Sequence, residues 1–248
     1  MLDYQAPADL LAGRVILVTG ASAGIGKTAA LTYAKAGATV ILLGRNVERL
    51  EAVYDAIEAA GGPQPAIIPL DMLGATDQHY RDMAATIENQ FGQLDGVLMN
   101  AGELGVLSPF DSIDDSTWDN VMKINVDATF RMTRALLPLL IASDDGRLIF
   151  TSSGVGKKGR AYWGAYAVSK FATEGMMQVL ADENEQGPLR VNCINPGATR
   201  TSMRAKAFPG EDPETLKTPE QLMPLYLYLM GPDSKGVNGQ SVDAQPKR

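Results

Sequence analysis

Short runs of apolar residues recur along the chain, and they set the first expectation about its fold. The runs lack the alternation of polar and apolar positions that a strand with one solvent-exposed face would show. They are typical of parallel strands that helices cover on both faces. The runs lie at residues 14–20, 38–44, 65–71, 94–100, 147–153 and 189–195, and we expect a last short strand near 237–243.

Helix-like segments separate these runs, so that strand and helix alternate along the whole chain. Their positions are 24–36, 46–60, 76–91, 115–142 and 163–184. Such alternation is the signature of right-handed β-α-β units in one sheet. We therefore predict an α/β fold: a single domain over residues 1–248 with a doubly wound, Rossmann-type parallel sheet of about seven strands and helices on both faces.

Three segments depart from this simple pattern. Residues 198–219 form a polar insertion after the sixth strand, at the sheet edge where doubly wound folds bind ligands, and we expect a substrate loop or lid there. The helices at 115–142 and 163–184 are apolar around most of their circumference, whereas a helix on one sheet face keeps a broad polar side. These apolar faces could be buried within the monomer or could form a subunit interface. We expect the interface, in a homodimer or homotetramer.

Composition narrows the class of partner. The 248 residues include 29 acidic and 22 lysine or arginine residues, and the formal net charge of −7 argues against a nucleic-acid or anionic-membrane surface. No apolar stretch is long enough for a membrane span, and the N-terminus lacks the features of a signal peptide, so we expect a cytoplasmic protein. Because Cys193 is the only cysteine and His79 the only histidine, we expect neither an intrachain disulfide nor a metal site of the usual zinc type.

A glycine-rich turn links the first apolar run to the first helix. Gly20, Gly24 and Gly26 lie in the stretch VTGASAGIGKTAA (18–30). Glycines let the backbone turn tightly and approach a phosphate, and a helix N-terminus attracts anions. The phosphate loop of nucleotide triphosphatases has four residues between its glycines, whereas Gly20 and Gly26 enclose five. The turn could serve only to pack the helix on the strand, but its place after the first strand favours dinucleotide binding.

The residues after the second predicted strand bear on which dinucleotide binds. NAD-binding sheets usually place a carboxylate there to accept hydrogen bonds from the ribose. Here Arg45 and Asn46 follow the strand, and the first carboxylate is Glu48. Arginine can pair with the 2′-phosphate of NADP, although it could also be a solvated residue that opens the next helix. We predict a preference for NADP(H), with NAD(H) also possible.

A tyrosine and a lysine four residues apart, Tyr166 and Lys170, share one face of a predicted helix. Bringing a tyrosine pKa from about 10 to neutrality needs roughly 4 kcal/mol. A solvated lysine one turn away supplies less than about 1 kcal/mol. The pair therefore suits proton transfer only in a low-dielectric cleft shared with a cationic nicotinamide ring. Ser153, at the end of the fifth predicted strand, could hold a substrate oxygen beside it.

Several ordered motifs together resemble the short-chain dehydrogenase/reductase family over essentially the whole chain. Residues 19–26 are similar to its cofactor turn, and Asn125, Ser153, Tyr166 and Lys170 fall on its catalytic tetrad. Ala23 stands where NADP-binding members often carry a basic residue, which leaves Arg45 to hold the phosphate. The cofactor-binding residues that the resemblance implies are Gly20, Ser22, Gly24, Ile25, Gly26, Arg45, Asp71, Asn100, Gly102, Tyr166, Lys170, Pro196, Gly197 and Thr201.

The resemblance implies an oxidoreductase that transfers a hydride between NADP(H) and a small carbonyl or alcohol compound, of the aldehyde or ketone reductase type. It assigns Tyr166 as the proton donor, Ser153 as the residue that holds the oxygen, and Lys170 as the ligand of the nicotinamide ribose that lowers the tyrosine pKa. Asn125 would anchor a water molecule that links Lys170 to solvent. An interpretation from another class stays open: a catalytically silent NADP(H)-binding regulatory or scaffold protein on the same fold.

The stretch GKKGRAYW (156–163) precedes the helix that carries the tyrosine. Its cations Lys157, Lys158 and Arg160 could suit an anionic or thioester-carrier substrate, but such a cluster is more often a solvated loop. The aromatic residues Tyr162 and Trp163 could line a substrate pocket or pack at the entrance of the helix, and the sequence does not decide between these.

Overall fold

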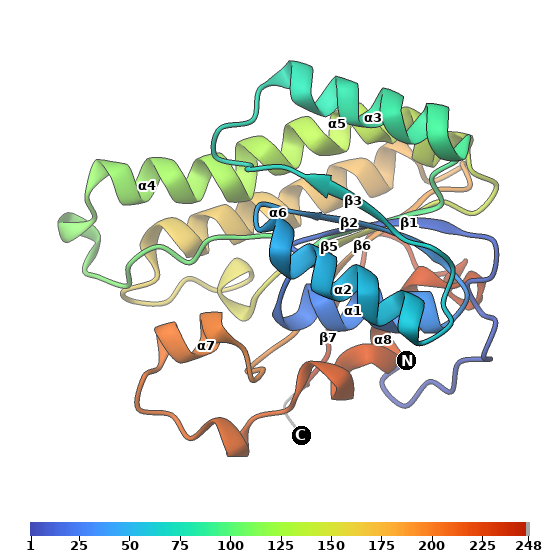
Figure 1. Ribbon diagram of the computed structural model, residues 1–248. Coiled ribbons are helices and arrows are strands. Elements are labelled where there is room, and N and C mark those ends of the chain that lie inside the picture. The colour runs from blue at the N-terminus through green and yellow to red at the C-terminus, as the bar shows by residue number, and fades with distance from the viewer. Residues whose placement is uncertain (247–248) are drawn as a thin grey trace.

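Seven parallel strands form one sheet at the centre of the molecule (Figure 1). The computed structural model describes residues 1–246, so the last two residues of the predicted domain lie outside the described part. The strands lie in the order β3-β2-β1-β4-β5-β6-β7. They are β1 Val15–Thr19, β2 Thr39–Gly44, β3 Ala66–Pro69, β4 Gly96–Met99, β5 Arg147–Thr151, β6 Arg190–Asn195 and β7 Ser241–Asp243. The predicted doubly wound α/β sheet is confirmed.

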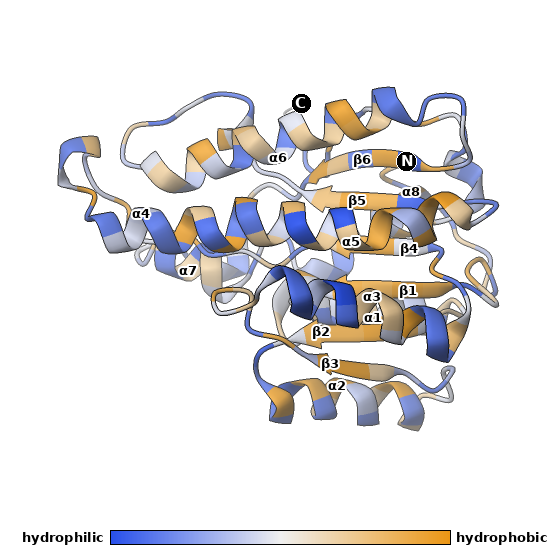
Figure 2. Cartoon of the chain, turned by 90° about the horizontal axis from the view of Figure 1, so that it is seen from above, coloured by the Kyte–Doolittle hydropathy of each residue, from blue (hydrophilic) through white to orange (hydrophobic). Residues whose placement is uncertain are grey.

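Helices cover both faces of this sheet because successive residues of a strand point to opposite sides. In β1, Ile16 and Val18 belong to one buried core, and Val15 and Leu17 belong to the other. The helices of the first core are α1 (Gly24–Lys35), α2 (Val47–Ala59) and α8 (Met223–Met230), and those of the second are α3 (Asp77–Phe91), α5 (Thr129–Ala142) and α6 (Gly164–Glu183). Figure 2 shows the apolar strands beneath α3, α5 and α6. Burial on both sides explains why the strands read as unbroken apolar runs.

Capping residues define where several of these helices begin and end. The Asn46 side chain accepts a hydrogen bond from the Arg49 backbone N–H at 2.9 Å and so caps α2. At α3 the Thr76 and His79 side chains form a reciprocal capping box, and Gly92 ends the helix with φ at 69°. His79 therefore has a local structural role at the surface.

Three segments differ from the pattern that their apolar residues predict. The helix expected at 115–142 consists of α4 (Asp115–Met122), a wider π-helical section (Lys123–Ala128) and α5. Helix α8 was not predicted. Its sequence, MPLYLYLM, has no charged residue, so it lacks the polar face by which a surface helix is identified. The polar insertion at 198–219 contains a short helix, α7 (Ser202–Ala207). No helix within residues 1–246 is long and apolar enough to cross a membrane.

The order of the strands determines where a ligand can bind. The chain passes from β1 outward through β2 and β3, and then returns to β4 on the other side of β1. Such a switch point opens a crevice at the carboxyl ends of the two central strands. The Thr19 hydroxyl bridges these ends by accepting hydrogen bonds from the backbone N–H groups of Asn100, at 2.9 Å, and Ala101, at 3.0 Å.

Candidate functional site

A cavity of about 760 Å³ lies at the carboxyl edge of the sheet. Its walls come from the glycine turn, from the ends of β4, β5 and β6, from the start of α6 and from the segment that contains α7. A smaller cavity of about 170 Å³ borders Arg45, Asp71 and Ser22. The two cavities share the lining residues Gly20, Ala101 and Gly102, so they adjoin each other at the switch point.

The glycine turn is closed too tightly for side chains. A Cβ on Gly26 would lie 2.3 Å from the Gly20 carbonyl oxygen, and one on Gly20 would lie 3.1 Å from the Ala101 Cα. Gly20 and Gly24 also adopt positive φ angles of 66° and 52°, which favour glycine. The N-cap residue of α1, Ala23, provides no side-chain cap, so the first N–H groups of the helix have no side-chain partner at this end.

This geometry fits the two ends of a dinucleotide. The turn offers a helix N-terminus to a pyrophosphate, and the smaller cavity places Arg45 beside Ser22 and Asp71. Of the cofactor-binding residues expected from the sequence, Gly26 borders neither cavity and instead packs against Gly20. Those that border the larger cavity are Gly20, Gly24, Ile25, Asn100, Gly102, Tyr166, Lys170, Pro196, Gly197 and Thr201.

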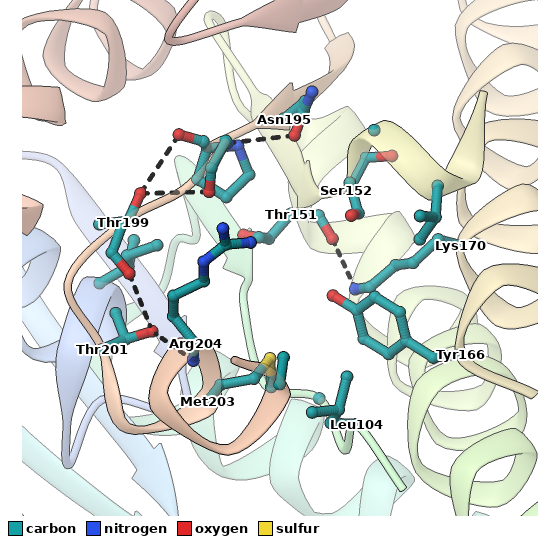
Figure 3. Close-up of a pocket in the computed structure, with 18 of the residues that line it drawn as sticks. Leu104, Thr151, Ser152, Tyr166, Lys170, Asn195, Thr199, Thr201, Met203 and Arg204 are labelled. Atoms are coloured by element: carbon teal, nitrogen blue, oxygen red, sulfur yellow. Dashed lines mark hydrogen bonds between the residues drawn. The ribbon is translucent and has the colours of Figure 1, made fainter. Parts of the chain in front are cut away.

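Tyr166 and Lys170 point from α6 into the larger cavity (Figure 3). The Lys170 ammonium donates a hydrogen bond to the Thr151 carbonyl at 2.8 Å and lies 5.5 Å from the centroid of the Tyr166 ring. Burial raises the pKa of Tyr166 to about 12, and a hydrogen bond with the Ser153 side chain opposes this rise. Burial also lowers the pKa of Lys170 to about 8, against the opposing effects of Cys193 and Glu174. In both residues burial favours the neutral form.

Asn125 lies in the π-helical section and is 2% exposed. Its amide N–H groups donate to the Glu103 carbonyl at 2.8 Å and to the Ser169 hydroxyl at 2.9 Å, while its Oδ1 accepts from the Glu103 N–H at 2.7 Å. Asn125 borders neither cavity, but a Cβ on Gly102 would lie 3.3 Å from its Oδ1 and 3.8 Å from the Lys170 ammonium. The four tetrad residues are therefore brought close together, with Asn125 in the layer behind the lysine.

Sequence reasoning missed a buried carboxyl group behind the site, that of Glu174. This residue follows Lys170 by one helical turn and is 6% exposed. Its Oε1 accepts hydrogen bonds from the Ser152 hydroxyl and, at 2.7 Å, from the Ser241 hydroxyl. It thus ties α6 to the end of β5 beside Ser153 and to β7. The spacing of four residues from Lys170 is the only signal that the sequence carried for this role.

Residues of the insertion at 198–219 border the cavity. Met203 and Ala207 of α7 pack with Leu104 and Val155 in a small apolar cluster that also contains Tyr166. The segment is held in place by a parallel bridge between Thr199 and Lys217 and by a bidentate ion pair of Arg204 with Glu211, at 2.6 Å for both hydrogen bonds. Trp163 borders the cavity and is also the N-cap residue of α6, whereas Tyr162 is exposed and does not border the cavity.

Comparison with known proteins gives consistent matches over the whole chain. The family profile described as short chain dehydrogenase matches residues 14–212. The uncharacterized oxidoreductase YciK of Escherichia coli is 59% identical over 247 residues, which cover 100% of this chain and 98% of that protein.

Two solved structures add information about ligands. A short-chain dehydrogenase of Shigella flexneri, complexed with NADP, has a TM-score of 0.95 and 60% identity over 97% of this chain and 100% of that one. A short-chain dehydrogenase of Escherichia coli CFT073, complexed with NADPH, has a TM-score of 0.95 and 59% identity over the same shares.

The tight glycine turn predicts opposite effects for two glycine substitutions. Gly26→Ala should destabilise the protein by about 1–3 kcal/mol, because the new methyl group has no space beside the Gly20 carbonyl. Gly236→Ala, in an exposed turn with no atom near its Cβ position, should stabilise it by about 0.4–1 kcal/mol. Urea unfolding of both variants measures the difference. Equal stability of Gly26→Ala and the unchanged protein would contradict the close contact.

Proposed function

The chain belongs to the short-chain dehydrogenase family, and from this premise we propose that it is an NADP(H)-dependent oxidoreductase that interconverts a small carbonyl compound and its alcohol. The observation that carries the proposal is the position of Tyr166 and Lys170 on the wall of a cavity that continues into the glycine turn. The alternative, a silent cofactor-binding protein, has no use for a proton donor and a lysine that both face the cavity beside Ser153.

In the proposed reduction, bound NADPH supplies the hydride that adds to the carbonyl carbon. Tyr166 donates its phenolic proton to the carbonyl oxygen, and its raised pKa of about 12 keeps that proton in place at neutral pH until the oxygen becomes basic. Ser153 holds the same oxygen through a hydrogen bond. Neutral pH lies below the pKa of Lys170, which is about 8, so the ammonium group is charged. Its positive charge stabilises the Tyr166 phenolate that remains after the proton transfer.

Asn125 is proposed to act behind this group as a positioning residue. Both of its N–H donors and one lone pair of its Oδ1 are engaged with Glu103 and Ser169. One Oδ1 lone pair remains to accept a hydrogen bond from a water molecule near Lys170. Such a water would return a proton to Tyr166 through the lysine, which is the role that the family resemblance implies.

Replacing the tyrosine hydroxyl tests the proposed chemistry. Tyr166→Phe should lower kcat for NADPH-dependent carbonyl reduction by about 100-fold or more, because general acid catalysis contributes this much, and should leave NADPH affinity within about twofold. Tyr54→Phe, on α2 and outside both cavities, is the matched control. The measurement is NADPH oxidation with a panel of aldehydes, ketones and quinones. Full turnover by Tyr166→Phe would refute the assignment, and saturable NADPH binding without turnover by the unchanged protein would favour the silent alternative.

The preference for NADP(H) over NAD(H) is proposed to depend on Arg45. This arginine borders the smaller cavity, and within residues 1–246 it forms no ion pair, so its guanidinium is available to a 2′-phosphate. The NADP and NADPH complexes of the similar structures support this proposal.

Reversing the charge at residue 45 measures how much Arg45 contributes to the preference for NADPH over NADH. Arg45→Asp should shift the ratio of kcat/KM for NADPH over NADH by about tenfold to a few hundredfold toward NADH, because a charged hydrogen bond is lost and a repulsion is added. Arg49→Asp, an exposed arginine one turn into α2, should leave the ratio unchanged. Equal efficiency with both cofactors in the unchanged protein would rule out the proposed preference.

The outer faces of α5 and α6 are proposed to form a subunit interface. Large apolar side chains there are exposed in the single chain: Phe130 and Ile141 on α5, and Val168, Phe171 and Val179 on α6. A cluster of this kind on neighbouring helices is typical of a protein–protein contact.

Light scattering coupled to size-exclusion chromatography tests this interface. The unchanged protein should elute as a homodimer or homotetramer, and the double variant Phe130→Glu/Val179→Glu should shift to monomer, because two charges would be buried in an apolar contact. Val106→Glu, at an exposed apolar residue outside both helices, should keep the assembly. A monomer at micromolar concentration of the unchanged protein would overturn the proposal.

A further inference from the structure

We propose that the substrate is a small carbonyl compound that carries a carboxylate or phosphate group, and that Arg160 and Lys158 bind this group at the mouth of the larger cavity. The inference rests on the proposed carbonyl reduction and specifies its substrate class. Three observations support this inference. Of three neighbouring cations, only Lys158 and Arg160 border the cavity. A row of aromatic rings connects Arg160 to Tyr166, and a defined turn holds Arg160 in place.

The three cations after β5 have different surroundings. The Lys157 ammonium donates to the Ser241 carbonyl at 2.9 Å and pairs with Asp243 at 3.2 Å, so it is directed to the end of β7 and does not border the cavity. Lys158 and Arg160 do border it. Within residues 1–246 their side chains form no hydrogen bond and no ion pair. This is so although acidic residues outnumber lysine and arginine by 29 to 22 in the chain. Two unpaired cations therefore face the cavity of an acidic protein.

A row of aromatic rings leads from the tyrosine to Arg160. The ring centroids of Tyr166 and Trp163 are 5.8 Å apart, and those of Trp163 and Phe208 are 5.9 Å apart. The Arg160 guanidinium carbon lies 5.6 Å from the Phe208 centroid. Contact with an aromatic face holds a guanidinium in place while its N–H groups stay free for an anion.

The second guanidinium on Phe208 cannot fill the same role. The Arg204 guanidinium carbon lies 3.8 Å from the Phe208 centroid, but its charge is balanced by the bidentate pair with Glu211. Figure 3 shows the Arg204 side chain extending from α7 into the cavity. The segment that contains α7 thus brings a neutralised arginine and an aromatic ring, and the unpaired positive charge comes from Arg160 and Lys158 in the segment before α6.

Between the tyrosine and the cations the wall is apolar. Leu104, Val155 and Met203 pack around Tyr166 and Trp163. An anion bound beside such a surface is partly removed from water, which strengthens its hydrogen bonds to a guanidinium. The cavity thus matches a substrate with three parts: a carbonyl at Tyr166, a planar or apolar body along Trp163, and an anionic group at the mouth. A neutral substrate would use only the first two parts.

The turn that presents Arg160 and Trp163 is held in a strained form. The Trp163 N–H donates to the Arg160 carbonyl at 3.2 Å, and Tyr162 between them has a φ of 75°. Tyr162 is the one non-glycine residue within 1–246 with a positive φ, in a turn position that usually favours glycine. Its carbonyl accepts a hydrogen bond from the Ser108 N–H at 3.1 Å, which ties the turn to the segment between β4 and α4. Strain of this kind persists where the surrounding structure determines the conformation, and it is concentrated at functional sites.

Two aldehydes of the same shape test the proposal. The probes are 4-carboxybenzaldehyde, which is anionic, and methyl 4-formylbenzoate, which is neutral, both assayed by NADPH oxidation. The unchanged protein should reduce the anionic aldehyde with at least tenfold higher kcat/KM at low salt, and this advantage should fall as salt screens the charges. Arg160→Gln should remove most of the advantage through a higher KM, and Lys158→Gln should remove part of it. Lys157→Gln, the adjacent lysine that faces β7, should keep the advantage within twofold.

The outcomes separate this inference from the proposed reaction. If both aldehydes are reduced with equal efficiency, or if Arg160→Gln and Lys157→Gln behave alike, the anion site is refuted while carbonyl reduction stands. If neither aldehyde is reduced, calorimetric titration of the NADP⁺-saturated protein with 4-(hydroxymethyl)benzoate and its methyl ester decides. Binding of the benzoate alone, weakened at least tenfold by Arg160→Gln, supports the anion site, and binding of neither or of both equally refutes it. A rise in the KM for NADPH in Arg160→Gln as large as that for the aldehyde would assign the arginine to the cofactor and overturn the inference.

Discussion

The absence of space at Gly26 is the constraint on which the rest of this site depends. Because α1 begins in contact with the Gly20 carbonyl, the helix N-terminus points at the carboxyl ends of β1 and β4. The Thr19 hydroxyl then joins these two strands through the backbone at Asn100 and Ala101. The same contacts that pack the first helix thereby open a cleft suited to a long anionic ligand. The backbone of the glycine turn therefore serves both the packing of α1 on the sheet and the binding of the ligand.

Burial has a second consequence deeper in the cleft. It raises the pKa of Tyr166 and lowers that of Lys170, so in both residues burial favours the neutral form. A neutral phenol is the form that a proton donor needs, and an ammonium with a pKa of about 8 still carries its charge at neutral pH. The carboxyl group of Glu174 supports this pair from behind by holding α6 against the ends of β5 and β7. The positions of the tetrad residues thus depend on contacts that lie outside the cavity.

The distribution of charge connects the cofactor and the proposed substrate. The chain is acidic overall, yet Arg45 borders the smaller cavity and Lys158 and Arg160 border the larger one. Cations at a binding cleft raise the local concentration of anionic ligands. A phosphorylated dinucleotide and an anionic carbonyl compound would both be drawn to the same edge of the sheet.

The order of strands and helices could be predicted from the sequence because it depends on local periodicity, and the tyrosine–lysine pair because it depends on helical spacing. The glycine turn was visible for the same reason, since three glycines in seven residues encode a backbone conformation. Helix α8 could not be found in this way, because its sequence has no charged residue and so no polar face. Glu174 became part of the site only through hydroxyl groups 22 and 67 residues away in the chain. The sorting of Lys157 from Lys158 and Arg160 likewise depended on where β7 and α7 come to lie, because contacts between distant segments leave no periodic trace in a sequence.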